Sequence, residues 1–92
     1  MQTTAPMKEK KNTMKDCVSK DVLYFETVNI ILSYEENTIF TVEKVSKDIL
    51  KKIPNANECF RELDMHLLNA IRQLIDLGYV EEAPRKYIRL SA

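Results

Sequence analysis

The chain has 92 residues, of which 45% are apolar and 30% are charged, and its 14 basic and 14 acidic residues give a formal net charge of zero. This length and composition suit one soluble globular domain with a single modest core. With a net charge of zero, the overall charge gives no reason to expect binding to nucleic acid or to a membrane. Such binding would have to depend on local clusters of charge. The charge is uneven: residues 1–20 hold five basic and two acidic residues, whereas residues 21–92 hold nine basic and twelve acidic ones.

The N-terminal residues are polar and rich in lysine. Residues 1–16 have no periodic apolar pattern, so we expect a disordered lysine-rich tail there and a folded domain over residues 17–92. The longest strictly apolar run is residues 30–32, far too short to cross a bilayer. Cys17 and Cys59 are the only cysteines and lie far apart in the sequence, which favours free thiols in a reducing compartment, with a single disulfide as the alternative. We therefore expect an intracellular protein of the cytoplasm or nucleus.

A first helix is predicted over residues 18–35. Its apolar side chains recur at steps of three and four, which places them on one face, and Leu23 and Ile31 widen that face. Ser19 or Asp21 is suited to cap the start. The stripe consists of Val18, Val22, Phe25, Val28 and Leu32.

A short strand and a second helix follow. Residues 38–40 are β-branched and aromatic and too few for a helix, so they predict a strand. Thr41 is a good N-cap, Glu43 favours the helix dipole, and Pro54 ends the helix. The apolar stripe of this helix consists of Val42, Val45, Ile49, Leu50 and Ile53.

The third helix is predicted over residues 57–77 and ends at Gly78, the only glycine of the chain. Glycine adopts, without steric cost, the left-handed conformation that a helix end needs. An unbroken stripe favours one long helix, whereas an N-cap at Asp64 would leave residues 55–63 as a separate turn. The stripe consists of Phe60, Leu63, Leu67, Ile71 and Leu74.

Two short strand-like runs end the chain. Residues 79–82 and 86–91 are joined by residues 83–85, and together they predict a two-stranded ribbon. In the second run, Ile88 and Leu90 point to one face, and Tyr87 and Arg89 point to the other.

The order helix, strand, helix, helix, strand, wing, strand resembles the winged-helix variant of the helix-turn-helix. The resemblance covers about residues 18–92 and implies a mainly α fold with a small antiparallel β-wing. It is carried by residues 40–42 at the start of the second helix, by Leu67, Ile71, Leu74, Gly78, Tyr79 and Val80 across the end of the third, and by residues 87–91 as the last wing strand.

In DNA-binding winged helices the third helix enters the major groove and the wing contacts the backbone. The resemblance therefore implies a small DNA-binding module of the transcription-regulator type, with residues 57–77 toward the major groove and residues 83–86 toward the backbone. Arg61, Asn69 and Arg72 have the chemistry to read base edges. The residues expected to hold phosphates are Lys44, Lys47, Lys51, Arg85, Lys86 and Arg89.

The charge of the third helix favours an alternative. Residues 58–77 hold two arginines against four acidic residues, which opposes contact with phosphates. The alternative is a winged helix that binds protein in a larger complex of the replication, telomere or ubiquitin-ligase type. Met65, apolar on the outward face, favours such a partner. A homodimer through the first helix is a further possible assembly.

We expect neither catalysis nor a metal or cofactor. His66 is the only histidine, and its spacing from Cys59 does not fit a zinc finger. One glycine in the chain excludes a glycine-rich phosphate loop. Glu81 and Glu82 are neighbours on a predicted strand, so they point to opposite faces and cannot act jointly on one substrate.

Overall fold

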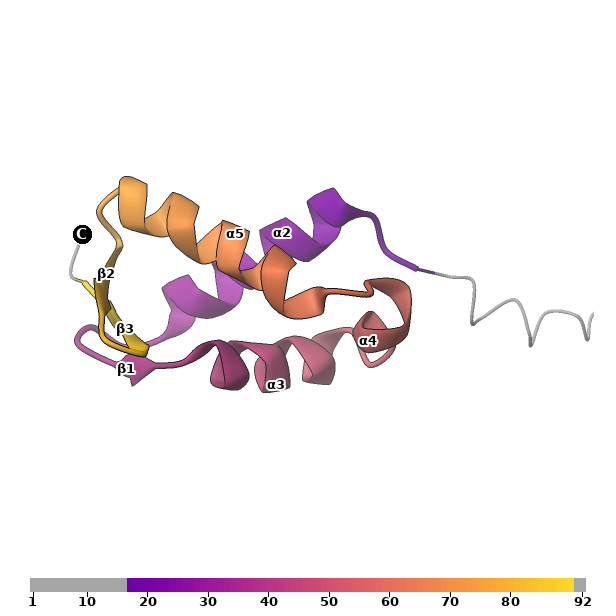
Figure 1. The fold of residues 1–92 in the computed structure, drawn as a ribbon, viewed down its shortest axis with the longest axis horizontal. Helices are drawn as coiled ribbons and strands as arrows, with labels where there is room; N and C mark the ends of the chain where they lie inside the picture. Colours follow the sequence, from indigo (N-terminus) through magenta and orange to yellow (C-terminus); the bar gives the residue numbers. More distant parts are fainter. Residues whose placement is uncertain (1–16, 91–92) are drawn as a thin grey trace, which may run out of the picture.

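The computed structural model describes residues 17–90, so the tail predicted over residues 1–16 lies outside the described residues. These residues form four helices and a three-stranded antiparallel sheet, which confirms the prediction of a mainly helical fold with a small sheet (Figure 1). The elements, labelled as in Figure 1, are α2 (Lys20–Ser33), β1 (Ile39–Phe40), α3 (Val42–Lys52), α4 (Ala56–Cys59), α5 (Leu63–Asp76), β2 (Val80–Ala83) and β3 (Lys86–Arg89).

The three longer helices pack against one another around one core. Helices α3 and α5 run in opposite directions along the long axis of the view, α2 contacts both, and the sheet and α4 lie at opposite ends (Figure 1). The largest side chains that are almost completely buried come from α2, α3, α5, β1 and β2, which shows that the long helices and the sheet share this core. They are Phe40, Leu23, Ile31, Ile49, Leu67, Ile71, Leu74, Val45 and Val80.

Helix α3 begins where local chemistry predicts. The Thr41 side chain accepts a hydrogen bond from the backbone N–H of Lys44 at 3.2 Å, and Glu43 lies in the first turn. Val45 and Ile49 are fully buried, and the helix ends two residues before Pro54. The N-cap and the apolar stripe of this helix are confirmed.

Helix α5 ends at Gly78 as predicted. Gly78 has φ of +90°, in the left-handed region. The backbone N–H of Tyr79 donates to Leu74 O at 2.9 Å, and that of Gly78 donates to Ile75 O at 3.1 Å. These two bonds define a Schellman motif, which satisfies carbonyls that the helix end leaves free.

The sheet has the strand order β1-β3-β2. Residue pairs Ile39–Ile88 and Phe40–Tyr87 join β1 to β3, and β2 pairs with β3 from Val80–Arg89 to Ala83–Lys86. The β2–β3 hairpin therefore has a loop of two residues, 84 and 85. The ring centroids of Tyr87 and the buried Phe40 lie 5.7 Å apart, so this face of the sheet covers the core.

The predicted inward face of the first helix is correct only in part: Leu23 and Ile31 are buried and Val18, Val28 and Leu32 pack against the core, but Val22 and Phe25 are exposed. The buried side chains of α2 are Leu23, Thr27, Ile30 and Ile31. Phe25, which we predicted to point inward, is 61% exposed. The helix carries apolar side chains all round, so spacing alone did not fix which of them point inward. Packing against α3 and α5 centred the buried face on Leu23, Thr27, Ile30 and Ile31.

The single long helix predicted over residues 57–77 is wrong. The chain forms the short helix α4, leaves the helical path at Phe60 (φ −126°, ψ 107°) and at Glu62 (φ −115°, ψ 66°), and then begins α5. The break lets Ala56 and Phe60 fill the core beneath the turn, where they are buried. Phe60 keeps the spacing of the helical stripe although it lies between two helices, which is why periodicity did not reveal the break.

The two cysteines form a disulfide, which corrects the expectation of free thiols. Cys17 and Cys59 are 42 residues apart in sequence, but their Cα atoms lie 5.6 Å apart. The fold brings the segment before α2 against the end of α4, within the range that a disulfide spans. Because the expectation of a reducing compartment depended on free thiols, the disulfide removes its basis. None of the helices between residues 17 and 90 has the length and apolar content to cross a membrane.

Candidate functional site

A lysine-bearing face lies on the outer side of α3. Lys44, Lys47 and Lys51 are spaced by three and four residues, opposite the buried Val45 and Ile49. The three lysines border one hollow of about 330 Å³ that is also lined by Thr41, Glu43 and Asp48. The structure therefore brings together the three lysines that the sequence predicted as phosphate contacts.

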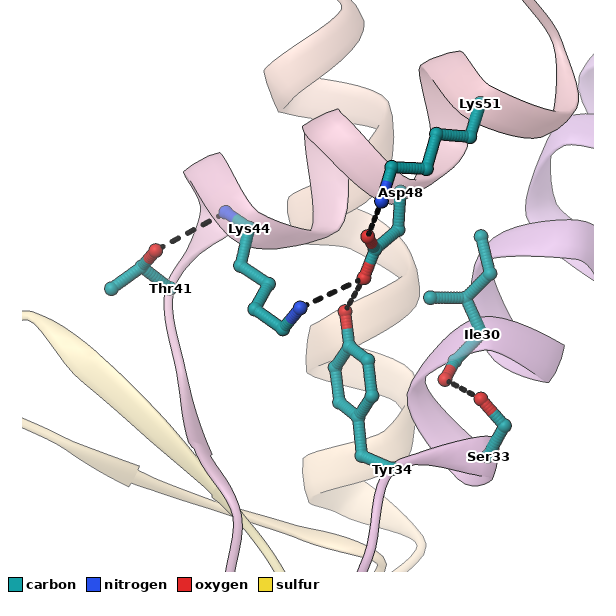
Figure 2. Close-up of polar contacts among 7 residues, drawn as sticks. All are labelled: Ile30, Ser33, Tyr34, Thr41, Lys44, Asp48 and Lys51. Atoms are coloured by element: carbon teal, nitrogen blue, oxygen red, sulfur yellow. Dashed lines mark hydrogen bonds and ion pairs between the residues drawn. The ribbon is translucent and has the colours of Figure 1, made fainter.

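Asp48 lies at the centre of this face. Its carboxylate is 3.4 Å from Lys44 Nζ and 3.9 Å from Lys51 Nζ, and it accepts a hydrogen bond from the Tyr34 hydroxyl at 2.7 Å (Figure 2). The Tyr34 ring lies 5.3 Å from that of the buried Phe40, and Lys44 Nζ lies 5.3 Å from the Tyr34 ring centroid. The carboxylate is thus held from the core side and contacted by two ammonium groups on the solvent side.

These contacts set the protonation states. Burial alone would raise the pKa of the Asp48 carboxyl, but the hydrogen bond from Tyr34 and the two ammonium groups lower it below its ordinary value. Burial, followed by the hydrogen bond to Asp48, raises the pKa of the Tyr34 phenol well above its ordinary value. At neutral pH, Asp48 is therefore ionised and Tyr34 protonated.

The hairpin tip lies beside the start of α3. Phe40 pairs with Tyr87, so Thr41, the N-cap of α3, and Lys86 both adjoin this pair. Figure 1 shows the hairpin against β1 at the end of the molecule where α3 begins. Arg85 and Lys86 are exposed, and Arg85 has φ of +66°, a conformation usually filled by glycine or asparagine.

The predicted base-reading residues lie elsewhere. Asn69 and Arg72 are exposed on the outward face of α5, together with Met65 and Asp76. Asn69 also lines a hollow between α2 and α5, with Lys20, Asp21, Leu23, Tyr24 and His66. Arg61 lies in the connection before α5 and lines a third hollow, with Asn57, Glu62, Leu63, Asp64 and Met65. Met65 thus connects Arg61 to the outward face of α5 that carries Asn69 and Arg72, and none of these three residues lines the hollow on α3.

Arg89 points inward. Its guanidinium donates to Leu32 O at 3.3 Å and to Leu90 O, while its Nε is buried without a partner among the described residues. Leu32 lies in the last turn of α2, whose free carbonyls and dipole favour a cation. Arg89 therefore stabilises the end of α2 and joins it to the sheet, so its guanidinium is directed at α2 and not at the candidate surface.

Two residues of the site were not found from sequence. Asp48 stands four residues after Lys44 and three before Lys51, which is a visible signal for ion pairs on one helix face. Tyr34 gives no such signal, because it is 14 residues from Asp48 and reaches it only through the packing of α2 on α3. Between residues 17 and 90, no group of three or more His, Cys, Asp or Glu side chains is placed to hold a metal ion.

Comparisons with protein-family models, with curated proteins and with solved structures find no match to this chain. The assignment of function therefore rests on the chain's own residues.

Proposed function

We propose that the chain is a small winged-helix module that binds double-stranded DNA, of the kind found in transcription regulators. The order of helices and strands supports the winged-helix assignment, with β2 and β3 as the wing. One departure is the connection from α3 to α5, which spans residues 53–62 and includes α4. A helix-turn-helix usually makes this connection in three or four residues.

The observation that carries the proposal is a local excess of positive charge. The surface formed by the outer face of α3 and the wing tip, here called the basic surface, contains Lys44, Lys47, Lys51, Arg85 and Lys86. Against these five basic groups stand Glu43 and Asp48, whereas residues 17–90 as a whole hold ten basic and twelve acidic residues. Glu81 and Glu82 are exposed on β2 and pair with Ile88 and Tyr87 beside Lys86, so they reduce the excess at the wing tip, although β3 separates them from β1 and the start of α3. Phosphate neutralisation of this local kind supplies most sequence-independent affinity for DNA.

In this proposal the five residues of the basic surface contact phosphates. Arg72 and Asn69 face outward from α5, where a guanidinium suits guanine and a side-chain amide suits adenine in the major groove. Arg61, just before α5, is the third residue proposed to contact bases. The wing tip would reach the backbone beside the groove.

A salt titration tests the proposal. Fluorescence anisotropy with a labelled duplex should show an affinity that falls with salt, with a slope of log K against log salt of roughly −4.5 for five contacts. Lys47→Ala should weaken binding and make the slope shallower by about 0.9. The matched control is Lys52→Ala, because Lys52 belongs to the same helix but pairs with Glu26 of α2 at 3.2 Å. The absence of duplex binding at low salt would overturn the proposal.

Binding to a protein is the second candidate, and exposed apolar side chains favour it. Phe25 and Val22 on α2 are 61% and 41% exposed, and Met65 on α5 is 54% exposed. Apolar groups of this kind are common at the centre of protein interfaces. This candidate predicts a partner, or a second copy in a homodimer, whose affinity changes little with salt and is lost in Phe25→Ser. Sedimentation at several concentrations measures the homodimer directly.

A further inference from the structure

The ion pairs of Asp48 place a fixed negative charge inside the basic surface. Lys44 and Lys51 have side chains that are 51% and 81% exposed, whereas that of Asp48 is 20% exposed. The lysine ends can therefore reach solvent, while the carboxylate remains behind them.

Asp48 cannot easily leave this position. The Tyr34 hydroxyl holds one carboxylate oxygen at 2.7 Å (Figure 2). The Tyr34 ring in turn packs against the buried Phe40. A hydrogen bond from a half-buried group to a charged oxygen is stronger than a neutral one. Two ammonium groups of α3 therefore share one carboxylate of the same helix, and Tyr34 at the end of α2 holds that carboxylate in place.

We propose that Asp48 competes with DNA phosphates for Lys44 and Lys51 and so lowers the sequence-independent affinity of the basic surface. This inference rests on the proposed DNA-binding function. A phosphate oxygen bound to Lys44 would lie roughly 6 Å from the Asp48 carboxylate, close enough for repulsion in a partly exposed site. The negative charge of Asp48 therefore opposes the binding of a phosphate to either lysine.

The competition has a direct consequence for recognition. Lys44, Lys51 and Asp48 together supply one net positive charge instead of two, so the backbone contributes less to affinity at every sequence. The base contacts of α5 then account for a larger share of the binding free energy. Asp48 would thus limit retention on non-specific DNA.

The test compares Asp48→Asn with a charge-matched control in the 92-residue chain. Asparagine keeps the shape of aspartate and an oxygen that accepts the Tyr34 hydrogen bond, but it removes the charge. Glu58→Gln removes the same charge from α4, at the end of the molecule away from the sheet (Figure 1). Both variants and the wild type are titrated with one mixed-sequence duplex over a range of salt, after thermal unfolding has shown that each is folded. Asp48→Ala, a better helix former, replaces the first variant if it fails to fold.

We expect Asp48→Asn to bind roughly tenfold more tightly at low salt, with a slope steeper by about 0.9, and Glu58→Gln to change affinity by less than about threefold. Equal gains in both variants would overturn the inference, because net charge alone would explain them. No gain in Asp48→Asn would overturn it while leaving DNA binding intact. A failure of all three proteins to bind the duplex would instead refute the proposed function.

A double-mutant cycle gives a second readout. If Asp48 holds Lys51, Lys51→Ala should cost little in the wild type, about twofold, and roughly tenfold in the Asp48→Asn background. Equal losses in the two backgrounds would show that the two residues act independently and would contradict the competition.

Discussion

Replacing Arg85 at the wing tip should change stability and DNA binding in opposite directions. Arg85 is exposed and has φ of +66°. This left-handed conformation costs a residue with a side chain about 1–2 kcal/mol, and glycine avoids the cost. Arginine at this position is thus unfavourable for the fold, which suggests that its charge serves another purpose.

The size of the effect follows from two terms. Arg85→Gly removes the conformational strain but increases the entropy of the unfolded chain, which costs about 0.5–1 kcal/mol. The net gain in the free energy of unfolding is about 0.75 kcal/mol at the middle of these ranges, which raises the Tm by roughly 3–6 °C in a domain of this size. If Arg85 contacts a phosphate as proposed, its loss should weaken duplex binding by roughly fivefold to tenfold at 0.1 M salt.

Thermal unfolding followed by circular dichroism measures the first effect, and duplex titration measures the second. Arg85→Lys is the control, because it keeps both the charge and the strained backbone, so its Tm and its affinity should remain near those of the wild type. A lower Tm for Arg85→Gly would show that the arginine side chain stabilises the fold. Unchanged affinity would show that the wing tip does not contact phosphate.

Three further predictions concern the scaffold. Gly78→Ala should destabilise by about 1–2 kcal/mol in urea unfolding, and the loss should come from the backbone alone, since no atom lies within 4 Å of an added Cβ; a loss below about 0.5 kcal/mol would contradict the role of Gly78 at the helix end. Reduction of the Cys17–Cys59 disulfide, which closes a 42-residue separation, should lower the free energy of unfolding by about 4 kcal/mol if chain entropy dominates, and Cys17→Ser should be insensitive to reductant. Because Asp48 has a folded pKa below its unfolded one, its contribution to stability is present above about pH 4 and is lost as the pH falls further. Asp48→Asn should therefore show a flatter loss of stability than the wild type in acid unfolding at a series of pH values.

Local chemistry predicted much of the scaffold. The cap at Thr41, the stripe of α3 and the helix end at Gly78 each depend on residues within a few positions of one another. Hydrogen bonds of caps and Schellman motifs form within a single turn, so the sequence alone specifies them. The side chains of Tyr87 and Ile88 on β3 point to opposite faces of the sheet. This alternation also depends only on neighbouring residues, and it agrees with the strand register.

Other features required the packed structure. The inward face of α2 could not be chosen from its sequence, because a helix with apolar side chains all round has no single preferred side until its neighbours are in place. The disulfide depended on where α4 lies relative to the segment before α2, and the break at Phe60 depended on how that side chain fills the core.

The candidate site combines both kinds of information. The sequence by itself determined that Lys44, Lys47 and Lys51 share one face of a helix, because that face follows from the period of 3.6 residues. Only the tertiary structure placed Tyr34 behind Asp48 and turned Arg89 toward α2. It also placed the tip of the β2–β3 hairpin at the start of α3 through the pairing of β1 with β3. These contacts join residues far apart in the chain, and their positions are set by the burial of a shared core.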